Sequence, residues 1–241
     1  MAETFVSKDL LKDKAALYGV LLDDKALERF DIYAKLLVEW NEKINLTAIT
    51  DPEGIVIKHF LDSLTIFSAV NIPEKAKIID VGTGAGFPGI PMLIARPDLD
   101  ITLMDSTNKR LNVIRDILEK LELTANVVHS RAEDAGKSAD FREKYDFSTA
   151  RAVSNLRDLS EYCLPFVKVG GAFISMKGAK AEEEIAEAKK AIKTLGGKIE
   201  AKKTFELEQT GERMIITVKK VSSTPPKFPR PSAKIAKNPL V

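Results

Sequence analysis

An aspartate and four closely spaced glycines follow a short apolar run within residues 77–89. This stretch reads Lys-Ile-Ile-Asp-Val-Gly-Thr-Gly-Ala-Gly-Phe-Pro-Gly. Glycine lacks a Cβ, so the chain can bend sharply there and a ligand can approach the backbone, while a following helix points free N–H groups at that ligand. The pattern predicts a buried strand, a ligand-binding turn and a helix, at the mouth of a nucleotide-type pocket.

The charge before the turn indicates which ligand fits. Asp80 lies two residues before Gly82, where a carboxylate repels a pyrophosphate but attracts the ammonium and sulfonium charges of S-adenosylmethionine. Residues 84–89 also match the GxGxxG pattern of dinucleotide enzymes, so the glycines alone do not separate the two ligands. Asp80 therefore carries the preference for a methyl donor.

Strand-like and helix-like segments alternate from residue 77 onward. Candidate strands are residues 78–81, 101–104, 126–129, 146–150 and 172–176, with helical stretches at 108–121 and 181–195. This alternation predicts an α/β fold with a mostly parallel sheet and helices on both faces. Two later strand-like runs, 198–207 and 214–221, flank a turn and predict an antiparallel C-terminal edge.

The two ends of the chain differ from this middle part. Apolar residues at spacings of three and four predict a packing helix before residue 60, in which Trp40 belongs to the apolar face. We expect an N-terminal helical extension over 1–60, a methyltransferase domain over 61–221 and a basic, Pro-rich tail over 222–241. The tail should be extended and unable to form a helix on its own. A polyanion could order it, and a solubilising tail without a partner accounts for it equally well.

The composition indicates a soluble globular protein, with 44% hydrophobic and 30% charged residues. The N-terminal residues contain no long apolar run, so we expect a cytoplasmic protein with no membrane partner. Cys163, His59 and His129 do not form a metal-ligand cluster by their spacing, so no metal is expected. We expect a monomer.

Acidic residues follow the second and third candidate strands, where an open α/β sheet binds its ligand. Asp105 lies about twenty residues after the glycine loop, where an acid accepts hydrogen bonds from ribose hydroxyls. Without the glycine loop, an ordinary strand-end acid that caps the helix at Asn108 would be the better account of Asp105. Ala132 and Glu133 are placed to line an adenine, and Arg151 lies at the edge of the same cleft.

These motifs and their flanks resemble the 16S ribosomal RNA guanine-N7 methyltransferases, a family first named glucose-inhibited division protein B. The resemblance covers nearly the whole chain past the first helix. It rests on residues 40–49, 59–64, 82–91, 105–106, 109–110, 130–133, 150–152, 177–178 and 229–230. It implies a class I, Rossmann-like methyltransferase that uses S-adenosylmethionine. The implied substrate is a guanine in the decoding-region loop of 16S rRNA, on the free RNA or on the small ribosomal subunit.

Two sets of site residues follow from these arguments and from the resemblance. The cofactor set is Asp80, Gly82, Gly84, Gly86, Phe87, Asp105, Ala132, Glu133 and Arg151. The RNA-binding set is His59, Lys109, Arg110, Arg131 and Arg151. An arginine suits guanine because N7 and O6 are both acceptors, and no catalytic base is assigned because N7 carries no proton.

Less specific interpretations of the same residues stay open. His59 can be a packing residue, although the resemblance favours a role at the target nucleotide. Lys109 and Arg110 can be the solvated first turn of a helix.

A nicotinamide oxidoreductase and an RNA-binding protein with a degenerate pocket are the two alternative functions. Asp80 and the absence of a recognisable proton-relay motif disfavour the first, and the intact loop disfavours the second.

Overall fold

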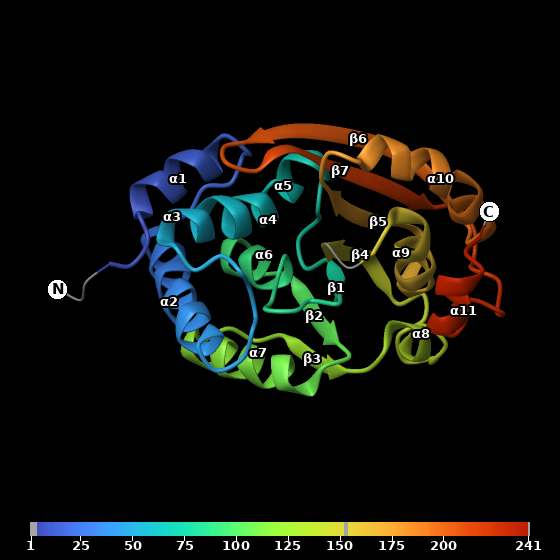
Figure 1. Cartoon of the computed structure of the whole chain (residues 1–241), viewed down its shortest axis with the longest axis horizontal. Coiled ribbons are helices and arrows are strands. Elements are labelled where there is room, and N and C mark those ends of the chain that lie inside the picture. The colour runs from blue at the N-terminus through green and yellow to red at the C-terminus, as the bar shows by residue number, and fades with distance from the viewer. Residues whose placement is uncertain (1–3, 152–153, 241) are drawn as a thin grey trace.

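Seven strands form one sheet in the computed structural model, which describes residues 4–151 and 154–240 (Figure 1). Their order is β3-β2-β1-β4-β5-β7-β6; the strands from β3 to β5 are parallel, and β7 is antiparallel to both β5 and β6. The strands are β1 (Lys77–Val81), β2 (Asp100–Asp105), β3 (Asn126–His129), β4 (Tyr145–Arg151), β5 (Val167–Lys177), β6 (Gly197–Leu207) and β7 (Gly211–Lys220). The mostly parallel sheet with an antiparallel edge is therefore confirmed.

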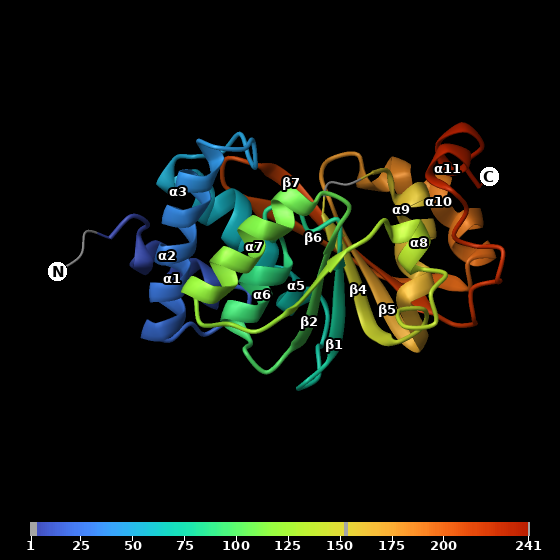
Figure 2. The ribbon, with the colours of Figure 1, turned by 90° about the horizontal axis from the view of Figure 1, so that it is seen from below.

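Helices cover both faces of this sheet (Figure 2). One face packs against α2 (Asp24–Asn41), α6 (Gly89–Ala95) and α7 (Asn108–Lys120), and the other against α9 (Leu156–Cys163) and α10 (Ala181–Thr194). Successive side chains of a strand point to opposite faces, so β1 contributes Ile78 to the first core and Ile79 to the second.

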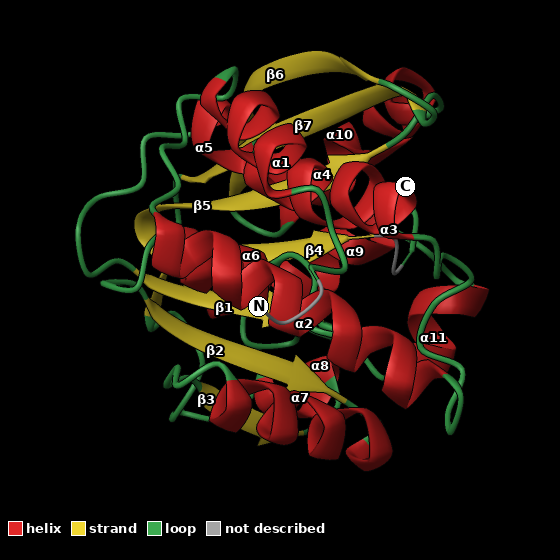
Figure 3. Ribbon diagram, turned by 90° about the vertical axis from the view of Figure 1, so that its left-hand side faces the viewer, coloured by secondary structure: helices red, strands yellow, loops and turns green. Residues whose placement is uncertain are grey.

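The N-terminal helices pack on the sheet domain through the first of these cores (Figure 3). Helix α1 (Lys8–Ala16) is followed by α2, which starts where the Asp23 side chain accepts a hydrogen bond of 2.7 Å from the Ala26 N–H. Next come α3 (Pro52–Gly54), the π-helix η1 (Ile55–Leu61), α4 (Asp62–Leu64) and α5 (Ile66–Ala69). The boundary that we expected after residue 60, between the N-terminal extension and the methyltransferase domain, lies inside η1.

The C-terminal region both confirms and corrects the sequence predictions. Strands β6 and β7 pair as the expected hairpin around a turn in which Gln209 has a φ of 61°. The tail, expected to be extended, instead contains α11 (Ser232–Lys237). Four of its prolines precede the helix and Pro239 follows it, so the six residues of α11 contain none. Phe228 is buried in the second core, so the tail is docked on the domain.

None of the helices within the described residues is long and apolar enough to cross a membrane.

Candidate active site

The glycine loop connects β1 to α6, and the buried Asp80 side chain holds its two ends by hydrogen bonds. The Oδ2 atom of Asp80 accepts hydrogen bonds from the Thr83 hydroxyl at 2.7 Å and from the Gly89 N–H at 3.0 Å. The side chain is fully buried, and burial raises the pKa of Asp80 to about 6 in spite of these two bonds. The sequence places this carboxylate at the pocket entrance, but the structure places it behind the loop, where it braces both loop ends.

Two glycines of the loop have opposite surroundings. Gly84 has a φ of +61°, and a Cβ added to it would meet only the Gly82 carbonyl oxygen, at 4.0 Å. A Cβ on Gly86, at φ +104°, would lie 2.5 Å from Cδ1 of Ile90 and 2.8 Å from the Tyr33 hydroxyl. The sequence predicts that Gly86 contacts the cofactor, and the structure adds a packing reason for glycine there: a side chain would point into the core, where Ile90 of α6 and Tyr33 of α2 leave no room.

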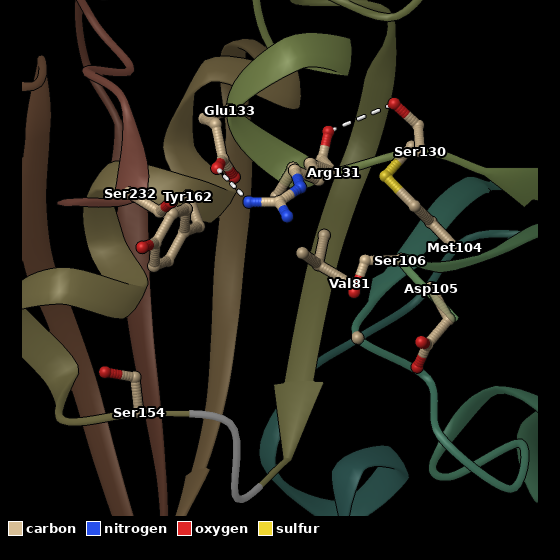
Figure 4. A pocket seen from close by; sticks show the side chains of 12 residues that line it. Val81, Met104, Asp105, Ser106, Ser130, Arg131, Glu133, Ser154, Tyr162 and Ser232 are labelled. Atoms are coloured by element: carbon tan, nitrogen blue, oxygen red, sulfur yellow. Dashed lines mark hydrogen bonds and ion pairs between the residues drawn. The ribbon is translucent and has the colours of Figure 1, made fainter.

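A first pocket of about 390 Å³ opens at the carboxyl ends of β1, β2 and β3 (Figure 4). In Figure 4, Asp105 and Ser106 lie on one side of it, and Tyr162 and Ser232 on the other. It is lined by Val81, Gly82, Met104, Asp105, Ser106, Ser130, Arg131, Ala132, Glu133, Ser154, Tyr162 and Ser232. Four predicted cofactor residues, Gly82, Asp105, Ala132 and Glu133, thus lie around one cavity.

A second pocket of about 410 Å³ lies on the other side of the glycine loop. It is lined by Leu46, Thr47, His59, Gly82, Thr83, Gly84, Ala85, Phe87, Asp105, Ser106, Arg110 and Arg151. The two pockets share Gly82, Asp105 and Ser106, so they meet at the ends of β1 and β2. Predicted cofactor and RNA-binding residues therefore occupy adjoining cavities.

Asp105 is the carboxylate common to both pockets. Its side chain accepts hydrogen bonds from the Thr107 N–H at 2.8 Å and from the Gly84 N–H at 3.0 Å, and Arg110 lies 3.7 Å away. The first bond holds Thr107, the residue before α7, but Asp105 does not cap the helix, which has no side-chain cap at its first turn. The second ties the end of β2 to the glycine loop, so Asp105 also shapes the site.

Phe87 is stacked among other planar side chains in the second pocket. The His59 ring lies parallel to it with centroids 4.5 Å apart, and the Arg151 guanidinium carbon is 4.5 Å from the Phe87 centroid. Tyr33 stacks on the same ring at 5.4 Å and donates a 2.7 Å hydrogen bond to the Ala85 carbonyl. The N-terminal helices thus fix the loop through Tyr33 and His59.

The neighbours of His59 determine its protonation. Arg151 has only donors and approaches Nδ1 at 3.3 Å, so Nδ1 is the acceptor and the proton is on Nε2, which lies 2.8 Å from the Thr47 hydroxyl. Burial, and then the Arg151 charge, lower the pKa of His59 from 6.5 to about 4. The side chain is therefore neutral at pH 7.

Asp62 and Arg213 belong to the site although neither was assigned a role from sequence patterns. The buried Asp62 carboxylate accepts from Arg151 Nη1 at 3.1 Å and from Arg213 Nε and Nη2 at 2.9 Å each. The position of Asp62, three residues after His59 on one helical face, is a signal that the sequence offers. Arg213 comes from β7, far along the chain, and has no such signal.

The remaining predicted RNA-binding residues are exposed around the pocket mouths. Arg110 lines the second pocket and Arg131 the first, while Lys109 lies at the exposed start of α7. The side chains of Arg110 and Arg131 are 46% and 66% exposed, and their nearest carboxylates are 3.7 and 3.8 Å away. Both cations are therefore accessible to a polyanion.

Other residues singled out by sequence have structural positions. Trp40 is partly buried against the core and donates a 2.7 Å hydrogen bond to Asp116, as its place in the apolar face predicts. His129 is exposed, 3.1 Å from the Ser106 carbonyl. Ala152, from the motif at 150–152, lies outside the described residues. Within the described ranges no cluster of His, Cys, Asp or Glu could hold a metal ion.

The sheet order, with the candidate site at the strand ends, is the class I, Rossmann-like methyltransferase fold. The chain resembles precorrin-6y C5,15-methyltransferase from Geobacter metallireducens with a TM-score of 0.50 at 16% identity, over 73% of this chain and 91% of that one. The [4+2]-cyclase SpnF matches with a TM-score of 0.54 at 14% identity, covering 67% and 82%. Such distant likenesses establish the fold alone.

Sequence similarity identifies the family. Residues 26–215 match the family described as rRNA small subunit methyltransferase G, and the chain belongs to it. The ribosomal RNA small subunit methyltransferase G of Acetivibrio thermocellus is 50% identical over 97% of this chain and 96% of its own. That of Brevibacillus brevis is 47% identical over 98% and 100%. Membership decides against the oxidoreductase that the glycine pattern left open.

Proposed function

We propose that the protein transfers the methyl group of S-adenosylmethionine to N7 of a guanine in the decoding-region loop of 16S rRNA. The observation that carries the proposal is the pair of pockets that share Gly82, Asp105 and Ser106. A cofactor in the first pocket and a nucleobase in the second would be neighbours at this junction.

The first pocket fits S-adenosylmethionine by its chemistry. Asp105 and Glu133 offer carboxylate oxygens to hydroxyl and amino groups of an adenosine, and Gly82 leaves the backbone open at the shared edge. S-adenosylmethionine supplies a methyl group on a positively charged sulfur. The carboxylates of the pocket favour such a cation over a pyrophosphate.

The second pocket fits a nucleobase that needs no proton transfer. Phe87, His59 and Arg151 form a stack of planar groups, and base stacking on such groups is worth about 1–3 kcal/mol per base. Guanine N7 carries a free lone pair, so the protein need only hold the base in line with the methyl group. Such placement can supply roughly 7–11 kcal/mol of barrier lowering. The neutral His59 serves as a packing and orienting group.

The exposed cations at the pocket mouths fit an RNA backbone. Arg110 and Arg131 line the two pockets and Lys109 is exposed next to Arg110 on α7, so all three can neutralise phosphates. Both pockets are built from one chain, so a monomer acting on 16S rRNA or on the small subunit in the cytoplasm suffices.

Methyl transfer to small ribosomal subunits that lack the modification tests the proposal. We expect label from methyl-labelled S-adenosylmethionine to appear on a single guanine of 16S rRNA, as N7-methylguanine. Subunits that already carry the modification are the matched control and should take up none. Label on another atom, or none at all with S-adenosylmethionine bound, would contradict the assignment.

A further inference from the structure

The C-terminal segment returns to the cofactor pocket after β7 and is held on the way by the buried Lys220 and the half-buried Arg142. The fully buried Lys220 Nζ donates to the Leu164 carbonyl at 2.6 Å and to the Thr224 hydroxyl at 2.7 Å. Arg142 donates to the carbonyl oxygens of Thr224 at 2.6 Å and Phe228 at 2.8 Å. These bonds fix residues 224–228 against the sheet domain.

An ion pair then holds the tail at helix α9. Arg230 donates through Nε to Glu161 Oε1 at 2.8 Å and through Nη2 to Oε2 at 2.7 Å, and its backbone N–H adds a third bond of 2.8 Å to Oε1. Glu161 is only 1% exposed. A carboxylate this deeply buried needs its partner, so the tail cannot detach without leaving the charge unpaired.

The Arg230 guanidinium also holds the segment that contains α11. Arg230 Nη1 donates a 2.7 Å hydrogen bond to the Asn238 carbonyl, so this bond joins a residue before the helix Ser232–Lys237 to the residue just after it. Ile235 is 1% exposed and anchors the inner face of that helix. The position of Ser232 is therefore set by Arg230 on one side and by the packing of α11 on the other.

The two residues next to this ion pair line the first pocket. Tyr162 follows Glu161 on α9, and Ser232 lies two residues after Arg230; both face the cavity from the side opposite Asp105 (Figure 4). Both offer a hydroxyl and carry no charge, which suits the neutral adenosine half of a ligand. Sequence patterns suggested a free basic tail, whereas the structure makes this tail part of a pocket wall.

We propose that Ser232, held in place by the tail segment 224–232, and Tyr162 of α9 form a wall of the cofactor pocket and contact S-adenosylmethionine, with Arg230 as their positioning residue. The inference rests on the proposed function, since it takes S-adenosylmethionine as the ligand. Binding is reciprocal, so a tail that helps to hold the cofactor is itself held more firmly when the cofactor is bound.

Calorimetric titration with S-adenosylmethionine tests this wall. Ser232→Trp places a large ring in the cavity from a half-buried position and should raise the Kd at least tenfold without disturbing the core. Arg230→Met should raise it by a similar factor, and Arg230→Lys, which keeps one charge but not the fork, should be intermediate. Lys234→Met, on the exposed face of α11, is the matched control and should bind like the wild type.

Two further readouts separate positioning from a general loss of structure. For Arg230→Met the KM for S-adenosylmethionine should rise while kcat and the KM for RNA change less than twofold. In the wild type, hydrogen exchange of the Arg230 and Ile235 amides should slow when S-adenosylmethionine is added. If the wild type binds S-adenosylmethionine and Ser232→Trp binds it equally well, the proposed pocket wall is refuted while the proposed function stands. If the wild type does not bind it, the proposed function fails and takes this inference with it.

Discussion

The Arg151 guanidinium lies over the ring of Phe87, with its central carbon 4.5 Å from the ring centroid. This contact joins the end of β4 to the glycine loop, and the His59 ring stacks on the same phenylalanine. Asp62 orients the guanidinium from behind and is itself held by Arg213. One planar group of the second pocket is therefore positioned by residues from three distant parts of the chain.

Replacing Arg151 by methionine should lower kcat/KM for RNA methylation at least tenfold, a loss of about 1.4 kcal/mol of transition-state stabilisation. Methionine fills similar space but can neither donate hydrogen bonds nor stack as a planar cation. Asp62 keeps its two bonds of 2.9 Å to Arg213, so the fold should survive, with a decrease in stability of about 1–2 kcal/mol. Single-turnover methylation and urea unfolding measure the two effects.

The control for this variant is Arg115→Met, which removes the same charge from an exposed position on α7. It should retain both activity and stability. Full RNA methylation by Arg151→Met would show that the guanidinium plays no part in the second pocket.

Alanine at the two contrasted glycines should separate stability from binding. Gly86→Ala places a Cβ within 2.8 Å of both Ile90 and the Tyr33 hydroxyl at a positive φ, and should cost about 2–4 kcal/mol in urea unfolding. Gly84→Ala meets no close atom and should cost only about 1 kcal/mol for its φ. Its methyl group enters the second pocket, so the KM for RNA should rise instead.

The Gly86 prediction is wrong if that variant unfolds at the wild-type urea concentration. Equal stability losses for the two variants would likewise contradict the opposite surroundings described for them.

Local patterns sufficed to predict the strands, the hairpin and the residues at the strand ends. Asp105, Ala132 and Glu133 lie in one pocket because parallel strands end at the same edge of a sheet, which follows from the alternation of segments alone. The direction of side chains within the glycine loop did not follow. Asp80 faces inward because Thr83 and Gly89 bind its carboxylate, a contact that spacing does not specify.

The ion-pair partners of residues far apart in the chain could not be predicted from the sequence either. Arg213 of β7 and Arg230 of the tail look like two surface charges in the sequence, yet each pairs with a buried carboxylate from a helix far earlier in the chain. Arg151 likewise gains its orientation from Asp62, 89 residues away. Such pairs depend on tertiary packing, so neither composition nor spacing reveals them.

Acid should destabilise the protein through His59. Its pKa is about 4 in the folded state and 6.5 when unperturbed, so between these values the unfolded chain binds a proton that the folded chain does not. The stabilisation is present above pH 6.5 and is lost as the pH falls toward 4, up to roughly 3 kcal/mol. Urea unfolding of the wild type and of His59→Gln at pH 7 and pH 4.5 should show this loss only with His59 present.

Other groups titrate in the same range, so only the difference between the two proteins is informative. Asp80, whose pKa is raised to about 6, acts in the opposite direction, because it favours folding as the pH falls from 6 to 3.8. An identical decline in His59→Gln and wild type would remove His59 as its source.

RNA binding should depend on salt through the pocket mouths more than through the tail. A triple alanine substitution of Lys109, Arg110 and Arg131 should lower the slope of log K against log salt by about 2, at roughly 0.7 per single-stranded phosphate contact. The matched variant removes three exposed tail charges, Lys227, Lys234 and Lys237, and should change the slope by less than about 1. Two basic residues near the end of the chain, Lys220 and Arg230, form ion pairs with Glu143 and Glu161, so their charges are already partly neutralised. Filter binding over a range of salt concentrations compares the variants, and a tail variant with the larger change in slope would place the RNA on the opposite side of the cofactor pocket.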